Sequence, residues 1–323
     1  MGNFLFNLMN HNKFGRQSAQ DLMTIISFQL HALGHKVGIN HKKFLMGEDG
    51  INLLFEGFHE KTLEVIDEVH KKGSRFIIIA TEEPTPKGFN HGIVHDMIVR
   101  QKIFPQIKPY IEGILHLVPG KHITDWYSQY APSAYIELGY APGLDRFENN
   151  IPIYDFGFFG GISARRKRLL QQLANRTGFG QRSVYISAFE DASKRDKEMR
   201  KCRVIVQVRK YEEMGLVSSS RCNTALCIGR PIVAEPHLLS KPWDEIVHFS
   251  KDDKSFFDDA LFIASTWESQ HRQQFNKFKK LLTPQFCIGE PLKKIGFVDK
   301  LSHREVFKPT FLEKTLEQQL SKM

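Results

Sequence analysis

The sequence is poor in cysteine and contains no long hydrophobic run. Its four cysteines include no CxxC pair, which excludes a zinc ribbon and a thioredoxin-type redox motif. No apolar segment approaches the ~20 residues that span a bilayer, and the first residues, MGNFLFNLMNHNKFG, have no basic region ahead of the apolar stretch. We therefore expect a cytoplasmic protein with reduced cysteines, without a signal peptide and without a membrane span.

Common phosphate-binding and metal-binding signatures are missing as well. Neither a Walker loop nor the GxGxxG dinucleotide fingerprint occurs, since the glycine turn of the second half has only two adjacent glycines. No DxD-like acidic pair follows a strand-like run. This absence favours chemistry without a bound metal ion, and no cofactor is expected.

Apolar and basic residues are abundant by contrast. Hydrophobic residues make up 41% and charged residues 25% of the chain, which is typical of a globular protein with room for two ordinary domains. The net charge of +9 favours an anionic partner such as nucleic acid, a phosphorylated small molecule or a membrane surface. Basic and acidic residues are interleaved, so the charge does not choose among these partners and is equally compatible with a role in solubility.

Strand-like apolar runs alternate with amphipathic helical segments through most of the chain. This alternation predicts an α/β protein with parallel sheets covered by helices. Strands are expected at 3–9, 36–40, 51–55, 75–80, 113–118, 133–138, 153–159, 183–188, 203–208, 232–235 and 247–249. Helices are expected at 18–33 (with Ser18 as N-cap), 60–72, 91–110 (interrupted by Pro105), 123–130, 164–176, 191–201, 218–228 and 254–282.

A stretch rich in turn formers, 139–150, divides the two halves. We predict a first Rossmann-like domain at 1–145 and a second at 150–300. Residues 301–323 are expected to form a tail helix that either returns to the first domain or takes part in a homodimer contact.

The segment FFGGISARR joins a predicted strand to a predicted helix. Glycines allow a close approach of the backbone to a ligand, and a helix N-terminus suits phosphate because its N–H groups are free. Arg165 and Arg166 occupy the first helical turn, where the helix dipole disfavours cations, so a nearby anion would explain them. The alternative is a plain tight turn with solvated arginines.

A second candidate phosphate site is the segment from Ser218 to Glu235, SSSRCNTALCIGRPIVAE. Three consecutive serines offer caps and hydroxyl donors at the start of a helix, and Arg221 follows one position later. Such a helix start suits the diphosphate of a nucleotide sugar.

These two segments resemble the donor domain of GT-B glycosyltransferases. SSSRCNTALCIGRPIVAEP resembles their S-R-x-x-E-A-L-A-x-G-x-P-V-V-x-E segment, and FGFFGGISARRKRLLQQL resembles their F-x-G-x-x-x-x-R-R opening. The pair Tyr211-Glu212 ahead of the serine–arginine helix is similar to CgeB-like transferases. The resemblance covers about residues 150 to 265.

The resemblance implies a GT-B fold, with the nucleotide sugar held mainly by the second domain and the ligand cleft between the two domains. It assigns donor binding to Gly160, Gly161, Arg165, Arg166, Tyr211, Ser219, Ser220, Arg221, Thr224 and Glu235. Glu235 would hold ribose hydroxyls, unless it is an ordinary strand-end carboxylate. One departure is Thr224, which stands where many retaining members carry a glutamate.

Acceptor activation in an inverting enzyme requires a carboxylate or histidine beside the acceptor hydroxyl. Loops that follow strands of the first domain make His11, Asp49 and Glu82 the preferred candidates, and Glu48, Glu83 and His95 are others. Each is also compatible with a structural or solvated role.

The leading hypothesis is a metal-independent glycosyltransferase, of hexosyl or related type, that uses a nucleotide-diphosphate sugar and an unidentified acceptor. A catalytically inactive GT-B-like binding protein and a nucleotide-sugar epimerase or hydrolase remain alternatives. Nucleic-acid binding would depend on charge alone and is not expected. The sequence leaves open the donor, the acceptor and the stereochemical outcome.

Overall fold

The computed structural model describes residues 2–7, 13–40, 43–47, 50–92, 95–176, 185–187, 192–210, 216–236 and 241–297. The chain divides into two compact units. Unit 1 comprises Met1–Glu137 and the chain from Pro284 onward, and unit 2 comprises Leu138–Thr283. Among the described helices, none is long and apolar enough to cross a membrane.

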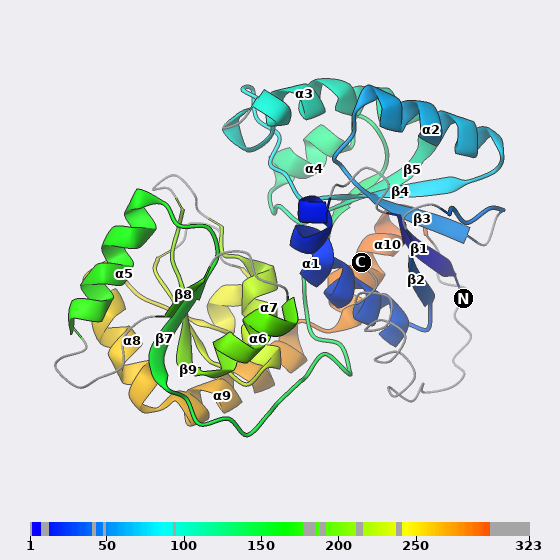
Figure 1. The fold of residues 1–323 in the computed structure, drawn as a ribbon. Helices are drawn as coiled ribbons and strands as arrows, with labels where there is room; N and C mark the ends of the chain where they lie inside the picture. The colour runs from blue at the N-terminus through cyan, green and yellow to red at the C-terminus, as the bar shows by residue number, and fades with distance from the viewer. Residues whose placement is uncertain are drawn as a thin grey trace. The chain divides into compact units, whose positions relative to one another are not determined.

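Unit 1 contains a six-stranded parallel sheet in the order β2-β1-β3-β4-β5-β6. Figure 1 shows α2, α3 and α4 on one face of this sheet and α1 and α10 on the other. Right-handed crossovers that leave β1 in opposite directions, to β2 and toward β6, place α1 on the face opposite to α2, α3 and α4. The strands are β1 (Asn3–Asn7), β2 (Lys36–Asn40), β3 (Gly50–Phe55), β4 (Arg75–Ala80), β5 (Ile111–His116) and β6 (Ser133–Tyr135). The helices are α1 (Lys13–Ala32), α2 (Glu60–Lys71), η1 (Phe89–Gly92), α3 (His95–Ile103), η2 (Phe104–Tyr110), α4 (Lys121–Tyr127), η4 (Gln285–Gly289) and α10 (Glu290–Lys294).

Unit 2 contains a five-stranded parallel sheet in the order β11-β10-β9-β7-β8. Its strands are β7 (Tyr154–Phe159), β8 (Tyr185–Ser187), β9 (Cys202–Gln207), β10 (Ile232–Ala234) and β11 (His248–Phe249). Its helices are α5 (Ala164–Arg176), α6 (Ala192–Arg200), α7 (Ser219–Cys227), η3 (Trp243–Glu245), α8 (Ser255–Ser265) and α9 (Trp267–Leu281).

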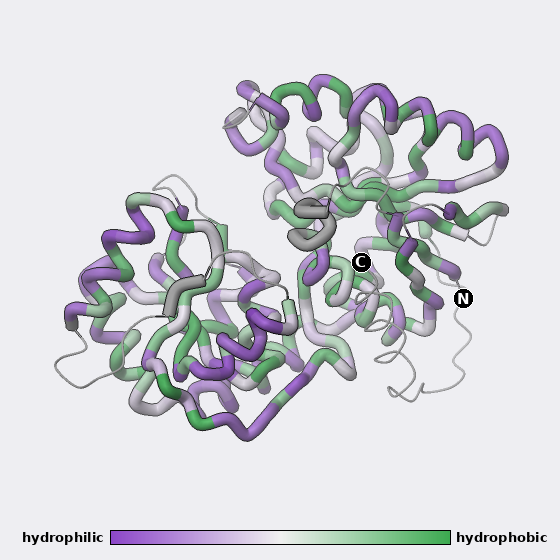
Figure 2. The backbone as a smooth tube through the Cα atoms, viewed as in Figure 1, coloured by the Kyte–Doolittle hydropathy of each residue, from purple (hydrophilic) through white to green (hydrophobic). Residues whose placement is uncertain are grey.

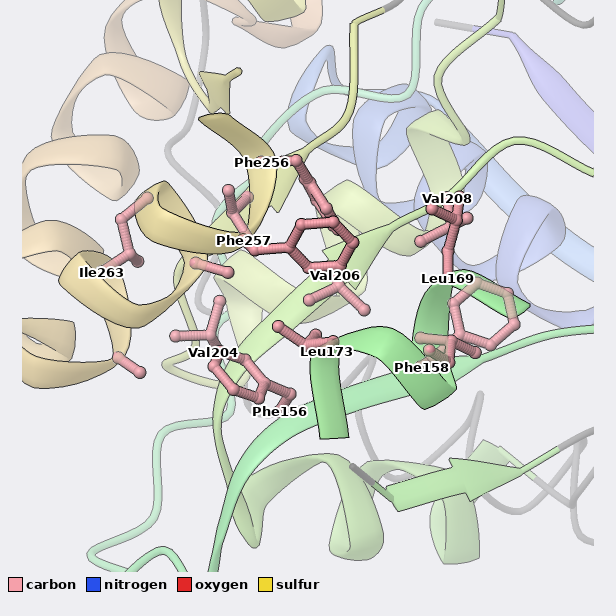
Figure 3. Packing of buried hydrophobic residues seen from close by; sticks show 14 residues of the cluster. Phe156, Phe158, Leu169, Leu173, Val204, Val206, Val208, Phe256, Phe257 and Ile263 are labelled. Atoms are coloured by element: carbon pink, nitrogen blue, oxygen red, sulfur yellow. The ribbon is translucent and has the colours of Figure 1, made fainter. Parts of the chain in front are cut away.

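The core of unit 2 shows why its strands are apolar on both faces. Alternate residues of β7 and β9, among them Phe156, Phe158 and Val206, pack against Leu173 of α5 and Phe256 of α8 (Figure 3). This two-residue period is that of a strand, and helices cover the opposite face as well. Hydrophobic residues concentrate on the strands of each unit, and hydrophilic residues lie on the outer sides of helices such as α2 and α5 (Figure 2).

Both sheets have the doubly wound order in which the second strand lies on one side of the first and the third strand on the other. The direction of winding reverses between β1 and β3 in unit 1 and between β7 and β9 in unit 2. In open α/β sheets, ligands bind outside the carboxyl ends of the strands at such a switch point. The residues that follow β3, β7 and β9 are therefore the first places to look for a site.

Three predicted helices differ from those in the structure. The predicted helix 254–282 is two helices, since the hydroxyls of Ser265 and Thr266 bond back to the carbonyl oxygen of Phe262, at 2.7 Å and 2.9 Å, and the backbone turns at Thr266. The predicted helix 91–110 is divided into η1, α3 and η2, with left-handed backbone at Asn90 and His91. The first helix begins at Lys13, so Ser18 lies inside it and is not its N-cap.

The units also differ in extent from the predicted domains 1–145 and 150–300. Residues 138–150 pack with unit 2, because the side-chain amide of Asn223 donates to the carbonyl oxygen of Gly139 at 2.7 Å and the amide of Arg146 donates to that of Cys227 at 2.7 Å. The chain returns to unit 1 at Pro284, where Ile295 packs against the open side of Gly113. The predicted tail 301–323 lies outside the described residues.

Candidate functional site

At the switch point of unit 2, a glycine without a side chain lets Arg221 reach the end of β7. Gly160, directly after β7, has φ of +152°, and a Cβ atom at this position would lie 2.7 Å from Nη2 of Arg221. Any larger residue would collide with the guanidinium and strain the backbone. Gly160 therefore leaves space over the strand end for the side chain of Arg221.

Arg221 bridges the two strands of the switch point. Its Nε donates to the carbonyl oxygen of Phe159 at 2.7 Å, and its Nη1 donates to Oε1 of Gln207 at 2.5 Å. Within the described part of the chain, the third nitrogen, Nη2, donates to no protein group. Two hydrogen bonds thus fix the guanidinium of Arg221, and its remaining nitrogen, Nη2, lies over Gly160.

Arg166, in the first turn of α5, bridges the residues that follow β7 and β9. Its Nε donates to the carbonyl oxygen of Val208 at 2.9 Å and its Nη1 to that of Gly161 at 2.7 Å. The guanidiniums of Arg166 and Arg221 lie 4.9 Å and 5.0 Å from the ring centre of Phe158. Two arginines therefore share one aromatic ring, although like charges repel.

A third arginine is neutralised by the buried carboxylate of Glu235, which follows β10 and is 1% exposed. Arg165 donates from Nη1 to Oε1 at 2.8 Å and from Nη2 to Oε2 at 2.5 Å, a bidentate pair. The backbone amide of Arg209 also donates to Oε1, and the guanidinium of Arg209 lies 3.5 Å away. Both oxygens of Glu235 are therefore engaged with protein groups.

Four guanidiniums, those of Arg165, Arg166, Arg209 and Arg221, gather at the strand ends of unit 2. Arg165 and Arg209 pair with Glu235, and Arg209 also lies 3.8 Å from the exposed Asp253. Burial, and next the neighbouring Arg166, lower the pKa of Arg221 to about 10. Arg221 thus keeps its charge at neutral pH, and an anion would relieve the cost of burying it. We call these four residues the arginine edge.

Helix α7, which carries Arg221 in its first turn, begins at Ser219. The hydroxyl of its N-cap, Ser218, makes no capping hydrogen bond, and Ser219 and Ser220 form the partly exposed first turn. The first amides of a helix have no partner within it, so they can receive an anion. Thr224 is buried further along α7. Nine of the ten predicted donor residues thus belong to this strand-end region and α7, and Tyr211 lies outside the described residues.

Unit 1 presents a pair of carboxylates at the ends of neighbouring strands. Glu56 follows β3 at the switch point and is 1% exposed, whereas the side chain of Glu82, just after β4, is 15% exposed. Arg100 of α3 lies between them, with Nη2 3.6 Å from Oε1 of Glu56 and Nη1 3.5 Å from Oε1 of Glu82. The guanidinium of Arg100 therefore lies within ion-pair distance of both carboxylates.

Further hydrogen bonds fix the two carboxylates. Thr81 donates its amide and its hydroxyl to Glu56, at 2.9 Å and 2.6 Å. The side-chain amide of Asn90, a residue in the left-handed conformation, donates to Glu82. Burial, and next the charge of Glu82, raise the pKa of Glu56 from 4.5 to about 7, against the opposing effect of Arg100. Glu56 therefore changes charge near neutral pH.

The raised pKa of Glu56 predicts a loss of stability as pH rises. Because its folded pKa lies above its unfolded value, protonated Glu56 stabilises the fold fully below about pH 4.5, and this stability is lost as pH rises to about 7. The loss amounts to about 3 kcal/mol. Urea unfolding from acid to neutral pH measures it as a change in the difference between the wild type and Glu56→Gln. A difference that does not vary with pH would contradict the assignment.

The other predicted bases differ in their placement. His11, Glu48 and Asp49 lie outside the described residues. Glu83 lies 3.7 Å from the ring of His91, and His95 is exposed at the start of α3. Sequence reasoning missed Glu56, although it directly follows the predicted strand 51–55. It also missed Arg100, Gln207 and Arg209, which no local pattern distinguishes.

Comparison with known proteins identifies the fold. No protein-family model matches the sequence, and no curated protein matches it. The structure is similar to T4 phage β-glucosyltransferase in complex with its UDP-glucose substrate, with a TM-score of 0.57, 8% identity and coverage of 91% of this chain and 99% of that chain. It is also similar to AviGT4, a glycosyltransferase involved in avilamycin A biosynthesis, with a TM-score of 0.51, 11% identity and coverage of 92% and 97%.

These structural neighbours are GT-B glycosyltransferases, and the chain has the GT-B fold of two Rossmann-like units. The chain is also similar to S. aureus TarM, at 13% identity and a TM-score of 0.48, and it spans 56% of the TarM chain with 78% of its own length matched.

Proposed function

We propose that this protein is a glycosyltransferase whose unit 2 binds the diphosphate of a nucleotide sugar. The observation that carries the proposal is Arg221 in the arginine edge, whose Nη2 lies over Gly160 while Nε and Nη1 are fixed on Phe159 and Gln207. Diphosphate has the charge and the oxygen geometry that arginine forks bind. UDP-glucose is the first donor to test, because it is the substrate of the T4 phage enzyme, which has the same fold.

The arginine edge also suits the chemistry of the leaving group. Negative charge grows on the β-phosphate oxygen as the bond to the sugar breaks, and fixed positive groups stabilise that charge without reorganising. Nη2 of Arg221, the first amides of α7 and the hydroxyls of Ser219 and Ser220 supply such donors. We therefore propose transfer that does not depend on a metal ion, as the missing DxD pair also suggests.

Glu82 is the proposed general base. Its carboxylate would take the proton of the acceptor hydroxyl while that oxygen forms a bond to the anomeric carbon of the sugar. The bond from this carbon to the phosphate oxygen breaks, and the nucleoside diphosphate leaves with the electron pair. Glu82 suits this role because its side chain is partly exposed, held by Asn90 and Arg100, and located at a strand end.

The two alternatives bind the same donor. Glu235, predicted to hold ribose hydroxyls, has both oxygens bonded to Arg165, and Thr224 stands in place of a glutamate. These features favour the inactive binding protein as the second candidate. A hydrolase or epimerase would consume the donor without an acceptor.

Thermal shift against UDP, GDP, dTDP and CMP sugars, followed by assays of donor turnover, separates these functions. We expect a shift with one nucleotide class, and release of its diphosphate in the presence of EDTA. Duplex DNA is included as an acceptor, because the T4 phage enzyme is a DNA modifying enzyme and this chain has a net charge of +9. Binding without turnover would favour the inactive protein, and no binding to any nucleotide would refute the proposal.

A further inference from the structure

The carboxylate pair of unit 1 holds more negative charge than its single arginine can neutralise. Arg100 lies 3.6 Å from Glu56 and 3.5 Å from Glu82, and its Nη1 is also 3.8 Å from Asp96. Asp96 is half-exposed and solvated, so it contributes little. With both glutamates ionised, a net negative charge remains where one of them is fully buried.

The groups that surround the pair do not remove this excess. Thr81 and Asn90 are neutral donors, to Glu56 and Glu82 respectively. Tyr127 of α4 donates its hydroxyl to the carbonyl oxygen of Glu82 at 2.8 Å, and burial raises its pKa well above the ordinary value, so it stays neutral. Within the described residues, Arg100 is thus the only cation within 4 Å of either carboxylate.

The two glutamates therefore behave as one coupled site. A proton that enters the pair resides on Glu56, the buried member, whose pKa burial and the charge of Glu82 raise to about 7. With Glu56 protonated, Arg100 faces a single carboxylate charge, that of Glu82. With Glu56 ionised, Arg100 is shared, and a second negative charge lies close to Glu82.

We propose that Glu56 is a positioning residue that acts through Arg100 to control how readily Glu82 accepts a proton from the acceptor. This inference rests on the proposed function, in which Glu82 is the base. It assigns to Glu56 the part of a charge switch: ionised Glu56 favours proton transfer to Glu82, and protonated Glu56 disfavours it. Glu56 itself remains behind Glu82 and does not contact the substrate.

Donor hydrolysis tests the switch without knowledge of the acceptor, with UDP-glucose as the probe and water as the acceptor. For the wild type we expect the turnover number at saturating donor to rise about tenfold between about pH 6 and about pH 8. Glu56→Gln imitates the protonated form, so its turnover should remain at the acid level of the wild type across this range. Glu112→Gln removes a carboxylate from the opposite edge of the same sheet and should retain the wild-type profile.

Each contrary outcome has a separate meaning. A Glu56→Gln profile that still rises with the wild-type midpoint would overturn the role of Glu56 and leave the proposed function intact. Loss of all turnover in folded Glu56→Gln would make Glu56 the base itself and likewise overturn the positioning role. A wild type that binds UDP-glucose but never hydrolyses it would refute the proposed function and, with it, the switch. Circular dichroism and an unchanged dissociation constant for UDP verify that the variant is folded.

Discussion

Replacing Glu82 with glutamine lowers the rate of sugar transfer by about 10²- to 10⁴-fold, which is the usual contribution of a positioned general base. Glutamine keeps the size of the side chain and its contacts with Asn90 and Arg100, but it cannot accept a proton from the acceptor. The affinity for the donor should remain within about twofold, because we assign donor binding to unit 2. Single-turnover kinetics and UDP titration measure the two quantities separately.

The control for Glu82→Gln is the same change at Glu112. This residue pairs with Arg75 at the amino-terminal ends of β4 and β5, at the edge of the sheet opposite Glu82. Glu112→Gln should leave transfer unchanged. Equal rates in the wild type and in Glu82→Gln would remove Glu82 from the mechanism.

Replacing Arg221 with alanine weakens UDP binding by about 30- to 150-fold, or about 2 to 3 kcal/mol, the usual loss when a charge-assisted hydrogen bond is removed. The physical reason is Nη2, which lies over Gly160 with no protein acceptor in the described part of the chain, held in place by Phe159 and Gln207. Isothermal titration calorimetry measures the loss.

Because Arg221 is partly buried, two further variants distinguish binding from folding. Arg221→Lys keeps the charge but not the fork, so we expect a smaller loss of affinity. Arg203→Ala removes an arginine from the amino-terminal half of β9, where its partner is Asp155, and lowers the net charge by the same amount. Arg203→Ala should bind UDP as the wild type does, and an equal loss in both alanine variants would show that only overall charge matters.

Much of the fold could be predicted because the strands are buried on both faces. The run of five apolar residues in Arg75–Ala80 predicted β4 to the residue, and the turn at Gly160 placed the start of α5 at Ala164. The boundary between α8 and α9 was harder to predict from the sequence. The apolar period continues through Ser265 and Thr266, and only the bonds from their hydroxyls to Phe262 divide α8 from α9.

The candidate site could be predicted only as far as strand ends and glycine turns mark it. The glycine turn after a strand predicted Gly160, Arg165 and Arg166 as site residues, and the serine-rich start of a helix predicted Arg221. The ion pair between Arg165 and Glu235 joins residues 70 positions apart, and its bidentate geometry depends on tertiary packing. The same applies to Arg100, which lies on a helix with no distinguishing pattern and meets its glutamates only in the folded unit.

Glu56 is a carboxylate at a strand end that the sequence analysis did not select as a candidate base. It follows β3 immediately, whereas Thr81 separates Glu82 from β4. What the sequence does not contain is the burial of Glu56, and burial is the main cause of its raised pKa. The identity of a strand-end carboxylate can thus be read from sequence, but its chemical character cannot.

The measurement that tests the central claim most directly compares UDP with uridine in calorimetric titrations of the wild type. If the arginine edge binds the diphosphate, UDP should bind at least about 100-fold more tightly than uridine, and the difference should shrink in high salt. Equal affinities for UDP and uridine, or a difference that Arg221→Ala leaves unchanged, would contradict the assignment of the arginine edge as the diphosphate site.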